Sequence, residues 1–166
     1  MGSGPGGTVA ARTLREEGWT VALVGQDLWG GTCPNRGCDP KKLLAAGMEV
    51  VQNNNQLAGE GLARMSGLDW PQLMAFKRSF TMPYPQQLRQ NAKEKGIDTL
   101  AGKAAFISER SIQLNGGVLE SDRYVIATGQ RPAMLDIEGK ERLKTSTDFL
   151  DLETLPDSIT FIGAGY

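Results

Sequence analysis

The 166-residue chain has no histidine, so it lacks the side chain that most often acts as a general base or metal ligand near neutral pH. It has only two cysteines, Cys33 and Cys38. Zinc usually takes four protein ligands, or three plus water, largely from Cys and His. We therefore predict no metal centre, and proton transfer must come from other groups.

Runs of one charge and long apolar segments are also missing. The net charge is −1 without a basic run, which argues against a nucleic-acid partner. Mean hydropathy is −0.30 and no apolar run approaches a membrane span, so we expect no membrane partner and a cytoplasmic location. No signal peptide is evident and cysteine is sparse, which argues against a structural disulfide of the secreted kind.

Both cysteines lie in one loop, residues 30–42, with the sequence GGTCPNRGCDPKK. Asp39 and Pro40 are typical of a helix N-cap and first helical residue, and an apolar helical series follows at Leu43, Leu44, Met48 and Val51. A Cys38 thiolate beside this helix start, with two lysines close by, should have a lowered pKa. The pattern favours an exchangeable disulfide; the alternative is two buried cysteines that fill a core.

The first residues, Gly2 to Gly7, fit the pattern G-x-G-x-x-G. A helical stripe follows and stops at Gly18, and Trp19–Val24 is expected to be a buried strand. Amides at such a helix start can hold a pyrophosphate. The acidic residue expected about 20 residues further on is replaced by Gly25, with Asp27 as a possible substitute. A flexible glycine linker is the alternative interpretation.

The remaining sequence predicts helices and then strands. Helices are expected from Met48 with a turn or a fraying helix end at residues 53–55, across residues 68–80, and after residue 85. Strands are expected at 99–101, 104–107, 111–114 and 118–119, with a hairpin turn at 115–116. A buried parallel strand is predicted at 124–127, ending in Thr128-Gly129, although an ordinary strand exit also fits. After a helix or turn at 147–155, a strand at 158–162 is predicted to enter Gly163-Ala164-Gly165.

The cysteine loop resembles the redox-disulfide signature of the FAD-dependent class I pyridine nucleotide-disulfide oxidoreductases, the group of glutathione reductase, dihydrolipoamide dehydrogenase and mercuric reductase. The glycine loop, second strand and Ala-Thr-Gly turn follow in the family's order. The resemblance implies an α/β fold: a Rossmann-like FAD-binding domain with a small antiparallel β-meander, truncated at both ends. It also implies an FAD-binding domain at 1–157 and the start of an NAD(P)H-binding domain at 158–166.

The resemblance further implies roles for individual residues. Cys33 and Cys38 would be the catalytic pair, with Cys38 the thiolate against the flavin and Cys33 the interchange thiol. Lys41 or Lys42 would stabilise the reduced flavin. The implied FAD contacts are Gly2, Gly4, Pro5, Gly6, Gly7, Gly31, Thr32, Cys33, Lys41, Lys42, Ala104, Ala127, Thr128 and Gly129. Gly163 and Gly165 would contact NADPH or NADH.

The function implied is electron transfer from NAD(P)H through FAD to the cysteine pair and on to a small-molecule disulfide, in a protein that is a homodimer at full length. Pro40-Lys41-Lys42 is closer to the glutathione reductase type, whereas Arg36 and Asp39 depart from the usual small or branched apolar residues. The alternatives are a non-catalytic FAD-binding or dithiol redox module, or an inactive gene fragment. We expect no NAD(P)H-dependent turnover by this chain alone.

Overall fold

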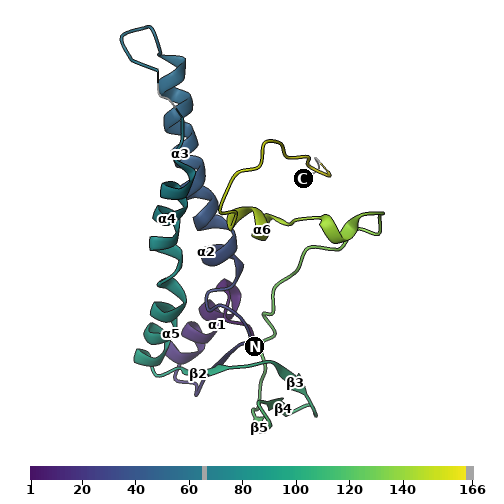
Figure 1. Cartoon of the computed structure of the whole chain (residues 1–166). Helices are drawn as coiled ribbons and strands as arrows, with labels where there is room; N and C mark the ends of the chain where they lie inside the picture. The colour runs from purple at the N-terminus through teal and green to yellow at the C-terminus, as the bar shows by residue number, and fades with distance from the viewer. Residues whose placement is uncertain (65–66, 164–166) are drawn as a thin grey trace.

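The computed structural model describes residues 1–64 and 67–163. The predicted α/β class is confirmed, with helices and two small sheets (Figure 1). In chain order the elements are α1 (Pro5–Glu16), β1 (Ala22–Gly25), α2 (Thr32–Arg36), α3 (Cys38–Gln56), α4 (Trp70–Thr81), α5 (Tyr84–Glu94), β2 (Asp98–Ala101), β3 (Ala104–Phe106), β4 (Ser111–Leu114), β5 (Gly117–Glu120), the 3-10 helix η1 (Lys140–Arg142) and α6 (Ser146–Leu150).

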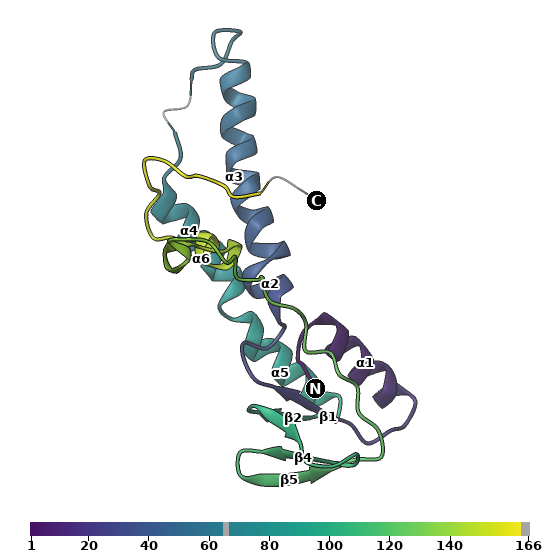
Figure 2. The same cartoon turned by 90° about the vertical axis from the view of Figure 1, so that its right-hand side faces the viewer.

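The two sheets are of different kinds. Strands β1 and β2 pair in parallel, with Leu23 opposite Thr99, and β3, β4 and β5 form an antiparallel meander. The predicted hairpin is confirmed: Asn115 and Gly116 have φ angles of 51° and 82°, as the common two-residue hairpin turn requires. The sheets lie near the amino terminus, and α3 and α4 rise away from them side by side (Figures 1 and 2).

Two separate apolar clusters hold the elements together. The first joins α1, β1, α5 and the loop after β1, and consists of Ala11, Leu23, Trp29, Ala92 and Ile97. The second joins α3, α4 and α6, and consists of Leu44, Trp70, Met74 and Leu150. The first cluster lies under the glycine loop, and the second fixes the helix that carries Cys38.

Polar contacts fix α6 and the following residues on α4. The side chain of Lys77 is 2% exposed, and its Nζ donates to the carbonyl of Leu150 and lies 3.1 Å from Asp151 Oδ1. Trp70 Nε1 donates to the carbonyl of Leu152 at 2.9 Å. Helix α6 also lies against α2, so this distant part of the chain touches the helix that bears Cys33.

The helix after the cysteines differs from the prediction at its start. It begins at Cys38 with Gly37 as N-cap, so Asp39 lies inside the first turn, where its charge still favours the helix dipole. It continues through the asparagines at 53–55 to Gln56, so no turn forms at the asparagines and the helix ends one residue after them. Packing of α3 against α4 outweighs the weak helix propensity of asparagine.

Two predicted strands are absent from the part of the chain that the structure describes. Residues 124–127 are extended without being a strand, and Ile126 is 65% exposed. This segment pairs with the first residue of the chain. The amino group of Met1 donates to the carbonyl of Val125, and the carbonyl of Met1 accepts from the amide of Ala127. Residues 158–162 also form no strand, and Phe161 is 79% exposed. In each case an apolar run has no full strand beside it to pair with.

Candidate functional site

The glycine loop and the cysteine loop touch through their backbones. A Cβ on Gly31 would lie 2.7 Å from the Cα of Gly4, and the amide of Gly30 donates to the carbonyl of Ser3 at 2.8 Å. Gly31 has a φ of 66°, which favours glycine. The start of α1 and the start of α2 are therefore held together with no side chain between them.

The turn at 127–128 meets the same glycine loop. A Cβ on Gly2 would lie 2.1 Å from the carbonyl oxygen of Ala127 and 3.1 Å from the nitrogen of Thr128. A Cβ on Gly7 would lie 1.8 Å from the carbonyl oxygen of Gly2. Gly6 is exposed one residue before, with its Cβ position 3.8 Å from the side chain of Ala127. Three sequence motifs thus converge on residues 2–7.

The two cysteines lie at the amino-terminal ends of two consecutive helices. Cys33 is in the first turn of α2, directly after Thr32, and Cys38 begins α3; both are half-buried free thiols. A hydrogen bond to Cys38 raises the pKa of the Cys33 thiol, and burial and repulsion from the charge of Cys38 and Asp39 act in the same direction. Cys33 therefore keeps its proton where an ordinary cysteine begins to ionise.

Asn35 is a residue of the site that the sequence prediction missed. Its Nδ2 donates to the carbonyls of Trp29 and Gly31, at 3.0 and 2.8 Å, and so closes the cysteine loop from within. An asparagine among glycines is a signal for such side-chain to backbone bonding. Lys41 and Lys42 are exposed in the first turns of α3, free to face a ligand's negative charge.

The carboxylate expected at the end of β1 is absent from Gly25, and the nearby Asp27 is paired with an arginine. Gly25 is buried at the end of β1. Asp27 accepts from both Nη atoms of Arg36, at 2.8 and 3.4 Å, and this guanidinium holds the pKa of the Asp27 carboxyl below its usual range. Both carboxylate oxygens of Asp27 are engaged by the cysteine loop.

The start of α1 fits the diphosphate of a dinucleotide. Gly4 is the N-cap without a side-chain hydrogen bond, Pro5 is the first helical residue, and no acidic residue lies in the first turn. The amides of that turn have no carbonyl partner within the helix, and the helix dipole adds partial positive charge. A cradle of this kind suits the pyrophosphate of FAD.

Three of the predicted site residues that the structure describes do not join this cluster. Ala104 begins β3 and pairs with Leu114 in the meander. Gly129 and Gly163 have φ angles of 73° and 92° in exposed segments with nothing within 4 Å of their Cβ positions. Gly165 lies outside the described residues.

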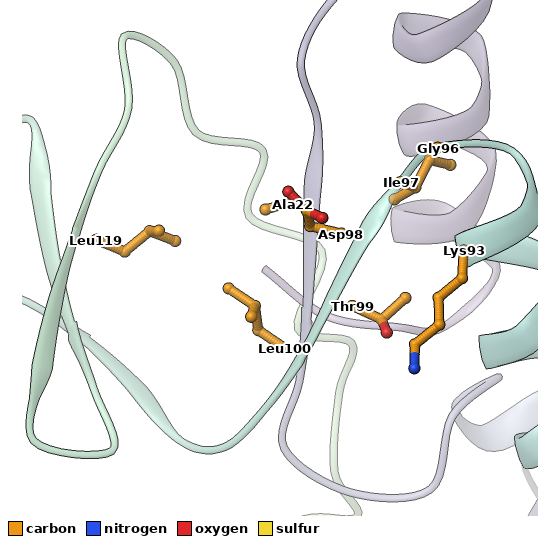
Figure 3. Close-up of a pocket in the computed structure, with 8 residues that line it drawn as sticks. All are labelled: Ala22, Lys93, Gly96, Ile97, Asp98, Thr99, Leu100 and Leu119. Carbon is orange, nitrogen blue, oxygen red and sulfur yellow. The ribbon is translucent and has the colours of Figure 1, made fainter.

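Two surface hollows of the described residues lie away from the cysteines. One, of about 450 Å³, is open and lies between the ends of α5, β1, β2 and β5 (Figure 3). Lys93 and Asp98 line it on one side and Leu119 on the other. It contains none of the predicted site residues, so the converging glycines define the candidate site.

A sequence model of one family, described as pyridine nucleotide-disulphide oxidoreductase, matches residues 1–166. The chain belongs to this family. The class I assignment is also supported by relatives, and members of the family are FAD-dependent and use NAD(P)H.

Curated relatives of this family are similar over the whole chain. A mercuric reductase of Staphylococcus aureus is 35% identical over 176 aligned residues, covering 100% of this chain and 31% of the relative. A glutathione reductase of Burkholderia cepacia is 31% identical, covering 100% and 37%. A dihydrolipoyl dehydrogenase of Chlamydia pneumoniae is 31% identical, covering 99% and 37%.

A solved structure shows the same arrangement. The HOCl-induced flavoprotein disulfide reductase RclA from Escherichia coli superposes with a TM-score of 0.75 at 28% identity, over 93% of this chain and 34% of that one. The chain therefore spans about a third of the length of the relatives and of this structure that it matches.

Two further observations concern the described residues only. No group of histidine, cysteine and acidic side chains there could hold a metal ion. None of the helices there combines the length and apolar character needed to cross a bilayer.

Proposed function

We propose that this chain forms the FAD-binding, disulfide-bearing part of an NAD(P)H-dependent disulfide oxidoreductase. The observation that carries the proposal is the convergence of the glycine loop, the cysteine loop and the 127–128 turn, with Gly31 packed on Gly4. Family membership and the disulfide reductase with the same fold support the same general function. Residues 1–157 would be the FAD-binding domain and residues 158–166 the start of the NAD(P)H domain.

Different residues would contact different parts of FAD. Residues 2–7 would hold its pyrophosphate at the start of α1, with Ala127 and Thr128 beside them. Thr32 and Cys33 would contact the flavin side, and Lys41 or Lys42 would stabilise its reduced, anionic form. When bound, FAD supplies an electron pair that it receives from NAD(P)H.

That electron pair and one proton would convert the Cys33–Cys38 disulfide into a Cys33 thiol and a Cys38 thiolate. The Cys33 thiol then donates a hydrogen bond to Cys38, which raises the pKa of Cys33. The Cys38 thiolate would take the Cys33 proton when Cys33 attacks. Attack on a substrate disulfide forms a mixed disulfide and releases one thiol; Cys38 then attacks Cys33 Sγ, restores the disulfide and releases the second thiol.

The substrate would be a small-molecule disulfide or a related acceptor. Pro40-Lys41-Lys42 favours the glutathione reductase type. The identities to mercuric reductase, glutathione reductase and dihydrolipoyl dehydrogenase, 35%, 31% and 31%, favour none of the three. The full-length protein would act as a homodimer.

The test is FAD binding by the chain, followed by reduction of the cysteine pair. The wild-type chain should retain FAD on ultrafiltration and, once reduced, show a long-wavelength absorbance from a thiolate next to the flavin. Cys38→Ser should lose this absorbance and keep FAD, whereas the matched variant Cys33→Ser should keep both. Failure of the wild type to bind FAD would contradict the proposal, and a band that persists in Cys38→Ser would contradict the role of Cys38.

A further inference from the structure

Gly25 occupies the place where a dinucleotide-binding fold carries a carboxylate for the adenosine ribose, at the end of a strand about 20 residues after the glycine loop. Its φ is not among the positive ones, so its backbone does not require glycine. The space around Gly25 is what limits the residue there. A Cβ on Gly25 would lie 2.8 Å from Ser3 Oγ and 3.1 Å from Trp29 Cε2. A larger residue at position 25 requires the side chain of Ser3 to move, and the indole of Trp29 to shift by a few tenths of an ångström.

The indole of Trp29 is held in that space from several sides. Trp29 is 7% exposed and packs in the core cluster with Leu23. The guanidinium of Arg89 lies 5.4 Å from the centre of the ring and also donates from Nε to Thr99 Oγ1 at 3.2 Å. The backbone carbonyl of Trp29 accepts from Asn35. A tryptophan fixed in this way cannot turn aside at little cost.

The nearest carboxylate along the chain is already neutralised. Asp27 lies two residues after Gly25, and Arg36 binds both of its oxygens, at 2.8 and 3.4 Å. Asp27 is therefore held toward the cysteine loop by Arg36. The end of β1 therefore carries a glycine, packed on Ser3 and the buried indole of Trp29, where a carboxylate is expected.

We propose, building on the proposed function, that Ser3 and Trp29 together keep position 25 small, so that no carboxylate at the end of β1 binds the ribose of the nucleotide. The adenosine part of the nucleotide is then held through its diphosphate at the start of α1, without a charged hydrogen bond to the ribose hydroxyls. The site accordingly accepts adenosine diphosphates whose ribose lacks a hydroxyl as readily as ordinary ones.

The experiment measures displacement of bound FAD, by flavin fluorescence, with ADP and with 2′-deoxy-ADP. On the wild-type chain the two nucleotides should displace FAD at concentrations within about twofold, because no charged bond to the 2′-hydroxyl is lost. The double variant Gly25→Glu, Trp29→Leu should prefer ADP by about tenfold, the size of one charge-assisted hydrogen bond. Trp29→Leu alone makes room without a carboxylate and should show no preference.

A thermal double-mutant cycle checks the steric part independently of binding. Gly25→Glu should lower the melting temperature, and Trp29→Leu should restore part of that loss, because the two side chains compete for one space. Equal losses with and without Trp29→Leu would overturn the role of Trp29.

The outcomes separate this inference from the proposed function. A wild-type chain that binds no FAD overturns the proposed function and this inference with it. A wild-type chain that binds FAD but prefers ADP tenfold over 2′-deoxy-ADP overturns this inference alone. If Asp27→Asn removes that preference, Asp27 supplies the carboxylate.

Discussion

At the scale of single residues, the segments of this site are joined by close backbone contacts at glycines rather than by contacts between side chains. Gly2, Gly7 and Gly31 leave no room for a Cβ, because carbonyl or Cα atoms of neighbouring segments occupy its place. A displaced side chain can rotate, but a displaced backbone must move with its whole segment. The site therefore depends on these positions more than on the exposed lysines after Cys38.

Gly31→Ala should separate the cysteine loop from the glycine loop. The new methyl group would collide with the Cα of Gly4 at 2.7 Å, and overpacking of this kind costs about 1–3 kcal/mol. Urea unfolding measures the loss, and FAD binding should weaken with it. Gly18→Ala is the matched control, because Gly18 also has a positive φ, 88°, but nothing lies within 4 Å of its Cβ position. Equal losses for both variants would mean that backbone strain, not contact, explains the effect.

The raised pKa of Cys33 gives a second prediction at this scale. The hydrogen bond to Cys38 and the charge of Cys38 favour the protonated Cys33 thiol, so Cys33 ionises at higher pH than an ordinary cysteine. Alkylation of Cys33 by iodoacetamide, followed by peptide mass spectrometry, should therefore rise at higher pH than for a free thiol. In Cys38→Ala the profile of Cys33 should shift to lower pH, because its partner is gone. A profile that stays in place would show that burial alone raises this pKa.

At the scale of elements, a buried lysine adds polar contacts to the apolar cluster that joins α6 to α4. The Nζ of Lys77 bonds the carbonyl of Leu150 and the carboxylate of Asp151, while Arg78 pairs with Glu153 nearby. The segment reaches α2 as well, so its docking supports the helix that bears Cys33.

Lys77→Met should loosen this docking. Methionine keeps the apolar length of the side chain but leaves the Leu150 carbonyl without its donor, which costs about 1–3 kcal/mol. The unfolding free energy should fall, and amide exchange in residues 146–150 should speed up. Lys93→Met, on an exposed face of α5, is the control and should change neither. Unchanged exchange in α6 would show that the apolar cluster alone holds it.

At the scale of the whole molecule, periodic patterns and turn residues predicted most elements. The helix before Gly18, the meander and its Asn115-Gly116 turn form as predicted, because each depends on residues near in sequence. The strands at 124–127 and 158–162 fail because a strand needs a partner that no local pattern supplies.

The candidate site was predicted as a set of motifs but not as a geometry. The spacing within the motifs identified the glycines and the cysteines as site residues, because these residue types seldom occur together in such patterns. It did not reveal that Trp29 fills the space beside Gly25, or that Asn35 closes the loop, because both depend on contacts across the fold.

The backbone-to-backbone contacts around residues 2–7 also bear on how such a site persists through evolution. Main-chain atoms are the same in every residue, so drift at other positions leaves the contacts among Gly2, Gly4, Gly7, Gly31 and Ala127 unchanged. Relatives that share only 28–35% of this sequence can therefore keep one nucleotide cradle while most of the surrounding side chains are replaced. In such a site a few glycine positions are constrained by main-chain contacts, and most other positions can change.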